Sequence, residues 1–284
     1  EPVLYASFDR EAPQFLLVGL LAEAHQCELH SRQERDGFDR LFDAAVGVEP
    51  AAKHGDRLTG PGRVGYHLRA AGTLEALARR GRTVPARDIA HHHLRAAGSR
   101  DLEPALDWCR KAADDANGRL AYEEAGRWLD AGLELFGALH LRANAEVLDL
   151  QLARAVASQR AGERGTRRRF LHAADTARGL GDAAGLRRVA LAFDRGFFAL
   201  LGQSDGERVQ LLREALDLSS DEPGERACLL AQLASELTWD DPEGDRFQLA
   251  DEALDLARTV DDRATLVRVL SLRPPTIWSP DTFD

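Results

Sequence analysis

The sequence predicts an all-α protein built from helical hairpins, and three observations support this prediction. Alanine, leucine and arginine are abundant, and their side chains lose little conformational freedom in a helix. From about residue 85 onward, amphipathic segments with helical periodicity alternate with short polar turns. Three of these segments resemble one another and recur at a nearly constant spacing, which is typical of a helical-repeat array.

Residues 1–84 are the less regular part of the sequence. Glycines and short apolar stretches interrupt this part, and residues 56–62 have the composition of a loop. Small and apolar residues spaced by three predict a helix over residues 64–80. Pro85 follows, either as a break or as the first turn of the next helix. We therefore expect a smaller N-terminal part, residues 1–84, and a repeat array, residues 85–284.

The repeat is clearest in residues 170–175, 211–216 and 249–254. Their matching alanines, Ala174, Ala215 and Ala253, are 41 and 38 residues apart, which is the length of a helical hairpin with its turn. The expected turns lie at residues 181–182, 221–224 and 261–262. We expect the alanines to allow close approach of helices while leucines fill the space between hairpins. The turns exclude a single uninterrupted coiled coil.

Charge and composition limit the classes of function. A net charge of −10 argues against direct nucleic-acid binding, which requires a basic face. The three cysteines, Cys27, Cys109 and Cys228, are far apart and odd in number, so we expect reduced core residues. The apolar run at residues 15–22 is too short to cross a membrane, and we expect a cytoplasmic protein. Methionine is absent even at position 1, which indicates a fragment or a sequence that has lost residues.

Two patterns suggest a bound cofactor or metal ion. Gly60, Gly62 and Gly65 match the spacing of a dinucleotide-binding loop, but a buried strand does not precede them, and we interpret them as a helix-entry loop. Residues 91–93 are three histidines, and adjacent helical residues point about 100° apart, so they cannot all face one ion.

A metal site would need a further histidine, such as His67 or His140. We instead expect one packed histidine and two on the surface, with no metal and no cofactor. Cys109 lies in an amphipathic segment and is expected in the core, although a nearby base would make it a candidate nucleophile. Other catalytic signatures are lacking in the sequence, so we expect a non-catalytic protein.

Arginines and aromatic residues are the best candidates for partner binding. Residues 164 and 167–169 are arginines, and this basic cluster could receive an acidic segment, a phosphate or nucleic acid, or could simply be a solvated helix start. Most aromatic residues should be core, but those on the inner surface of an array would form a pocket for a peptide or an apolar small molecule. Our candidate partner-binding residues are Trp128, Phe197, Phe198, Trp239, Arg167 and Arg168.

Several segments carry a family resemblance. They read ARDIAHHHLRAAG at 86–98, PALDWCRKAA at 104–113 and AYEEA at 121–125, with further similarity at 229–237, 250–258 and 278–282. Residues 86–284 thereby resemble the tetratricopeptide-like region of large actinobacterial LuxR-family and related signal-transducing ATPase regulators. The resemblance implies a tetratricopeptide-like superhelix. Residues 58–71 resemble the last helix of the winged-helix segment that precedes the repeats in such proteins.

The resemblance implies a sensor or protein-interaction module of a bacterial transcriptional regulator, in which a protein, a peptide or a small effector binds the helical array. The Walker A loop and the DNA-binding helix-turn-helix of the family have no match in this sequence. The alternative is an α-helical enzyme or small-molecule-binding protein with an unrecognised site. A third possibility is a segment that forms homodimers.

Overall fold

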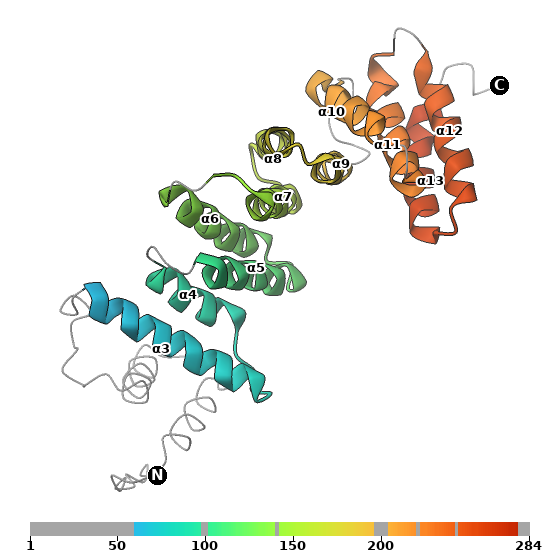
Figure 1. Cartoon of the computed structure of the whole chain (residues 1–284). Helices are drawn as coiled ribbons and strands as arrows, with labels where there is room; N and C mark the ends of the chain where they lie inside the picture. Colours follow the sequence, from blue (N-terminus) through green and yellow to red (C-terminus); the bar gives the residue numbers. More distant parts are fainter. Residues whose placement is uncertain are drawn as a thin grey trace, which may run out of the picture. The chain divides into compact units, whose positions relative to one another are not determined.

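The computed structural model describes residues 60–97, 102–139, 142–195, 204–219, 222–241 and 244–277. Every regular element in these ranges is a helix, and they contain no strand, so the all-α prediction is confirmed (Figure 1). None of the helices in these ranges combines the length and the apolar character that crossing a membrane requires.

The chain divides into two compact units, residues 1–120 with 134–139, and residues 121–133 with 140–284. The described helices of the first unit are α3 (Gly60–Arg79), α4 (Ala86–Ala96) and α5 (Leu102–Gly118). Helix α6 (Tyr122–Ala138) contributes its beginning to the second unit and its end to the first. The division expected after residue 84 lies between α3 and α4, and it stays a prediction because residues 1–59 lie outside the described ranges.

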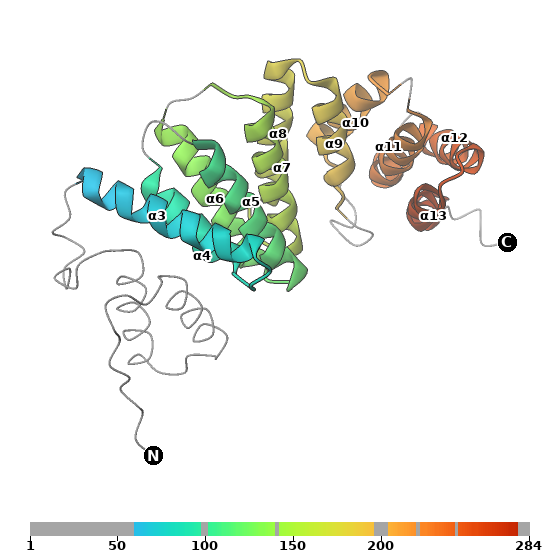
Figure 2. The same ribbon diagram turned by 60° about the horizontal axis from the view of Figure 1, so that its bottom comes forward.

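In the first unit α4 packs against both α3 and α5 (Figure 2). Small side chains allow this packing, because Ala70 and Ala71 of α3 and Ala90 of α4 are completely buried. Ile89 and Leu106 fill the space between them and are also inaccessible to solvent. Helix α3 confirms the helix predicted over residues 64–80 and begins slightly earlier.

In the second unit, consecutive helices pair into hairpins. After α6, its elements are α7 (Ala145–Arg160), α8 (Thr166–Leu180), α9 (Ala183–Ala192), α10 (Gly206–Asp217), α11 (Pro223–Glu236), the short 3₁₀ helix η1 (Leu237–Trp239), α12 (Asp245–Thr259) and α13 (Arg263–Ile277). Helix α8 packs with α9, α10 with α11, and α12 with α13. The second helices also contact one another in order, α7 with α9, α9 with α11 and α11 with α13.

Polar turn residues end and begin these helices, as the sequence predicted for residues 181–182 and 261–262. Gly181 closes α8 with a φ of 65°, a conformation that favours glycine. Asp182 then begins α9 by accepting a hydrogen bond from the Gly185 amide at 2.8 Å. Asp262 accepts hydrogen bonds from the amides of Ala264 and Thr265 at the start of α13. The third turn was predicted over residues 221–224, and this prediction is wrong at its end, because Pro223 and Gly224 already belong to α11; residue 221 lies outside the described ranges.

The three matching alanines lie where the repeat predicts them. Ala174 of α8, Ala215 of α10 and Ala253 of α12 all have an exposed fraction of 0%, so their burial is confirmed. Helix α11 is buried around almost its whole circumference because α9, α10, α12 and α13 surround it. The core of the second unit is therefore continuous from α7 to α13.

Gly185 allows α9 to approach α7 closely. A Cβ atom at this position would overlap both the Asp182 carboxylate and a methyl group of Leu148, which is buried in α7. We expect Gly185→Ala to lower the free energy of unfolding by about 1–3 kcal/mol through overpacking. Gly179→Ala is the matched control in α8, where a Cβ meets no atom within 4 Å, and it should be neutral or stabilising. Urea denaturation of both variants tests the prediction, and equal effects would contradict it.

Candidate functional site

Ion pairs join successive hairpins of the second unit at a nearly constant sequence separation. The pairs are Asp149–Arg188, Arg167–Asp205, Arg178–Glu214, Arg187–Glu225 and Arg195–Glu236, with separations of 39, 38, 36, 38 and 41 residues. The matching alanines recur at 38 and 41 residues, so each ion pair joins a helix to its counterpart in the next hairpin.

Four of these pairs tie the hairpin α8–α9 to the hairpin α10–α11, and we call these four pairs the four-corner clamp. The donor–acceptor distances are 2.7 Å for Arg167–Asp205, 2.9 Å for Arg178–Glu214, 2.7 Å for Arg187–Glu225 and 2.5 Å for Arg195–Glu236. The hairpin α8–α9, with the residues that follow it, supplies every arginine, and α10–α11 with its N-cap supplies every carboxylate. The clamp therefore fixes which turn of one hairpin lies beside which turn of the next.

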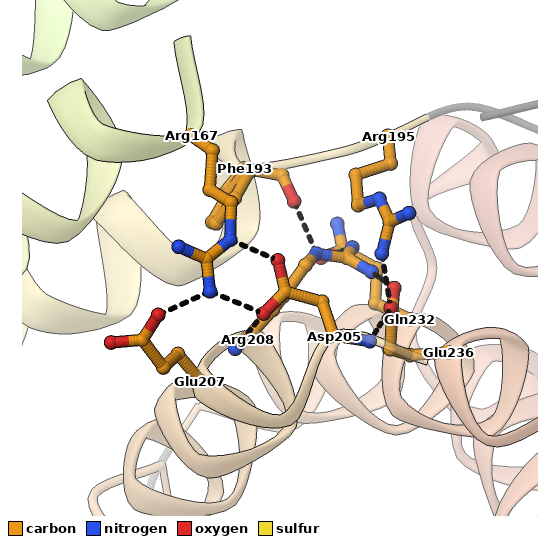
Figure 3. Close-up of polar contacts among 8 residues, drawn as sticks. All are labelled: Arg167, Phe193, Arg195, Asp205, Glu207, Arg208, Gln232 and Glu236. Atoms are coloured by element: carbon orange, nitrogen blue, oxygen red, sulfur yellow. Dashed lines mark hydrogen bonds and ion pairs between the residues drawn. The ribbon is translucent and has the colours of Figure 1, made fainter. Parts of the chain in front are cut away.

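One corner of the clamp continues into a buried polar centre (Figure 3). Arg208 of α10 and Glu236 of α11 form an ion pair there, and their exposed fractions are only 4% and 7%. Glu236 also accepts hydrogen bonds from Arg195 and from the Asp205 amide, the latter at 2.8 Å. Both oxygens of this carboxylate are thus satisfied, as a buried charge requires.

The guanidinium of Arg208 also holds the carboxyl end of α9. Its Nε donates to the Phe193 carbonyl at 2.7 Å, and the guanidinium lies 5.6 Å from the centre of the Phe193 ring. Gln232 and Arg268 donate to the Leu191 carbonyl, and Gln159 donates to the Asp194 carbonyl. These donors satisfy carbonyls that a helix end leaves unpaired, and the cations favour the negative end of the helix dipole.

The protonation states in this centre follow from the same contacts. Burial raises the pKa of Asp205, but hydrogen bonds from Arg167 and from the Arg208 amide outweigh it and hold the pKa below its ordinary value. Burial lowers the pKa of Arg208, and Glu236 opposes that shift. Asp205 accepts from Arg167, and Glu236 accepts from Arg195 and Arg208. The centre is built to hold helices together.

A second polar centre joins α6, α7 and the start of α8. Arg154 of α7 is buried, and its guanidinium contacts Asp130 at 2.8 Å and Glu163 at 2.9 Å. Ser158 donates to the same Glu163 carboxylate at 3.1 Å, and Ser158 and Thr166 share a hydrogen bond of 2.8 Å. Glu163 has a pKa below its ordinary value because the contacts with Arg154 outweigh the opposing effect of burial.

Gly126 makes room for the Arg154 guanidinium on the surface of α6. A Cβ atom at this position would lie 3.0 Å from Cζ of Arg154. We expect Gly126→Ala to lower the free energy of unfolding by about 1–2 kcal/mol, because the buried arginine must shift from its two carboxylates. In the same helix, Gly137→Ala adds a Cβ with no atom within 4 Å and should be neutral or stabilising. Thermal unfolding of the two variants distinguishes the loss of the Arg154 contacts from the effect of helix propensity. A stabilised Gly126→Ala would refute the idea that this glycine makes room for the Arg154 guanidinium.

In the first unit, polar contacts join α3 to α4 and α5. Glu75 of α3 accepts hydrogen bonds from His93 of α4 and from the Trp108 indole of α5, each at 2.8 Å. His67 and His92 also contact each other across α3 and α4, with their Nδ1 atoms 2.9 Å apart. Among the described residues, no group of three or more histidine, cysteine, aspartate and glutamate side chains is placed to hold a metal ion.

A pocket of about 360 Å³ lies between α4 and α5 in the first unit. Pro85, Ala86 and Arg87 line one side, and Ala112, Asp115 and Arg119 line the other. Asp115 accepts a long hydrogen bond of 3.4 Å from the Ala86 amide at the start of α4. This carboxylate occupies the position where a helix start would otherwise favour an anionic ligand.

Three of the six residues predicted to bind a partner have described side chains, and their selection as a binding site stays a prediction. Trp128 is half-buried on α6, and Arg167 is occupied by its ion pairs with Asp205 and Glu207. Arg168 is exposed on the first turn of α8. Of the predicted partner-binding residues, Phe197, Phe198 and the side chain of Trp239 lie outside the described part of the chain.

Sequence reasoning missed the residues that matter most in the two polar centres, Arg154, Arg208 and Glu236. Each is a charged residue on an otherwise apolar helix face, and this is the signal that could have identified it. Cys109, which was predicted to be a core residue, is buried, and burial raises the pKa of its thiol to about 12.

Comparison with known proteins gives no assignment, because no protein-family model matches the chain and no curated protein matches it. The function is therefore inferred from the helices and their polar contacts.

Proposed function

We propose that this chain is a tetratricopeptide-like interaction module, the sensor or partner-binding part of a bacterial transcriptional regulator. The observation that carries the proposal is the set of ion pairs between equivalent helices of successive hairpins, at separations of 36 to 41 residues. Such hairpin stacking supports an extended surface to which each repeat contributes side chains at the same position.

The first helices of the hairpins provide this surface. His172 of α8, Arg213 of α10 and Asp251 of α12 each lie two residues before a matching buried alanine, and all three are exposed. His172 is hydrogen-bonded to Gln151, and Asp251 is ion-paired with Arg273. Because the alanines face the core, residues at this offset project outward from each hairpin in turn. We propose that these positions contact a protein or peptide partner.

Stacked hairpins also suggest how binding is communicated. A partner that contacts several first helices at once favours one arrangement of the hairpins over others. In a regulator, that preference would bias the position of neighbouring domains. Pairing of the hairpins through the four-corner clamp supports such a role, because it couples the position of one hairpin to that of the next.

Panning a random 12-residue peptide library on the purified chain tests the proposed function. We expect enriched peptides that lose at least about tenfold in affinity for the triple variant His172→Ala, Arg213→Ala, Asp251→Ala, since each position supplies one exposed contact. Glu222→Ala, an exposed change at the start of α11, is the control and should bind as the wild type does. Failure to enrich any peptide, or equal affinity for wild type and triple variant, would refute binding at this surface.

A further inference from the structure

The contact between α3 and α4 contains an unusual pair of imidazoles. His67 of α3 and His92 of α4 share a hydrogen bond between their Nδ1 atoms at 2.9 Å, and their ring centres are 5.2 Å apart. The His91 ring centre lies 5.4 Å from that of His92 and 6.2 Å from that of His67. Tyr66 packs against His67 edge-on, with ring centres 5.1 Å apart. Four aromatic rings therefore meet at this end of the contact.

A hydrogen bond between two Nδ1 atoms constrains protonation. One imidazole donates its Nδ1–H and the other accepts with its Nδ1 lone pair, so at least one ring must be neutral. When both rings carry a proton on each nitrogen, two donors face each other and the bond is lost. Two positive charges then lie at hydrogen-bond distance in a half-buried contact, where water screens them poorly.

The charged groups around the pair oppose protonation further. From α3, Arg63 acts on His67, and from α4, Arg95 and His91 act on it in the same sense. His67, His91 and His93 act on His92 in that sense too. Of the carboxylates of these two helices, Glu75 accepts from His93 and from Trp108 of α5, and Asp88 favours the protonated form of His91. From α5, Lys111 lies over the Trp108 ring.

We propose that the α3–α4 contact is a proton-sensitive latch, which is closed while His67 and His92 share one proton between their Nδ1 atoms and opens when both rings become charged. Opening would expose the alanines of α3 and the α4 residues that they cover. The latch lies in the first unit, so the proposal is independent of the peptide surface on α8, α10 and α12.

The pH range follows from the direction of the shifts. Burial lowers the pKa of His67, and His91, Arg95 and Arg63 lower it further. Burial and the three neighbouring histidines lower the pKa of His92 from 6.5 to about 4. The open state has ordinary histidines and binds more protons, so closure is fully favourable above pH 6.5 and weakens as the pH falls toward 4. Glu75 acts in the same direction at lower pH because its pKa is also below its ordinary value: burial raises it, but hydrogen bonds from His93 and Trp108 outweigh that effect.

Hydrogen exchange of the full chain at pH 7 and pH 5, read by mass spectrometry and corrected for the intrinsic exchange rates, tests the latch. We expect peptides of α3 and α4 to lose about tenfold in protection at pH 5, while peptides of α8 to α11 keep theirs. The double variant His67→Asn, His92→Asn can still share a hydrogen bond but does not titrate, and it should lose the pH effect. His91→Asn removes a neighbouring ring but leaves the hydrogen bond between the two Nδ1 atoms, so it should keep most of the pH effect.

Unchanged protection of α3 at pH 5 would overturn the proposal, and so would an undiminished pH effect in the double variant. Circular dichroism at pH 7.5 shows whether that variant is folded. If it is not, NMR titration of the imidazoles in the wild-type chain decides the question. A His92 pKa below 5 supports the latch, and a value near 6.5 overturns it.

Discussion

Replacing Glu236 with alanine is expected to lower the free energy of unfolding by about 3–5 kcal/mol, because it leaves the buried Arg208 guanidinium without its counter-charge. Glu236 also accepts hydrogen bonds from Arg195 and from the Asp205 amide, so the change removes the acceptor for three donors at once. Two hairpins meet at this residue, and we expect the second unit to unfold at a lower urea concentration.

Two further variants make this prediction specific. Glu207 contacts Arg167 at an exposed position, and Glu207→Ala should cost less than about 1 kcal/mol. The double variant Arg208→Met, Glu236→Leu replaces the ion pair with apolar side chains and should recover much of the loss seen in Glu236→Ala. A Glu236→Ala variant as stable as Glu207→Ala would show that the ion pair does not hold the hairpins together.

Phe170→Ala should lower the free energy of unfolding by about 3–5 kcal/mol. Phe170 of α8 is completely buried and stacks on Phe193 at the end of α9, with ring centres 4.7 Å apart and an angle of 9° between the rings. Truncation opens a cavity beside the Phe193 ring, and Arg208 contacts the carbonyl of the same residue, so the apolar core and the polar centre should weaken together.

Chemical denaturation read by far-UV circular dichroism measures this loss. The control is Phe247→Ala, because Phe247 has an exposed fraction of 38% and its removal opens no internal cavity. Adding Phe170→Ala to Glu236→Ala should cost less than the sum of the two single losses, since both act on the end of α9. A strictly additive result would indicate that the aromatic stack and the ion pair are independent.

The helices could be predicted from the sequence because their signals are local. Leucine and alanine spacing defines a helical face within a dozen residues, and Gly181 or Asp262 marks a turn by its own conformational preference. Comparing the segments around Ala174 and Ala215 also reveals the repeat of about 40 residues. For these reasons the all-α fold was predicted and the hairpins of the second unit lie where the spacing placed them.

The polar centres could not be predicted, because their partners are far apart along the chain. The chain has 47 acidic residues, and the sequence does not indicate which of them forms an ion pair with Arg208. The packing of α10 against α11 determines that this residue is Glu236. Arg167 and Arg168 illustrate the same limit. Neighbours on a helix point about 100° apart, so one is held by Asp205 while the other faces solvent, although the sequence presents them as one basic cluster.

The four-corner clamp also bears on how similar hairpins avoid misassembly. Chains made of look-alike units are prone to pair the wrong units during folding, or to exchange units between molecules. At the clamp, one hairpin contributes only cations and the next only anions, so two copies of the same hairpin would meet with like charges at every corner. The charges therefore favour the correct order of the hairpins, because the shared alanine and leucine pattern alone does not distinguish one hairpin from the next.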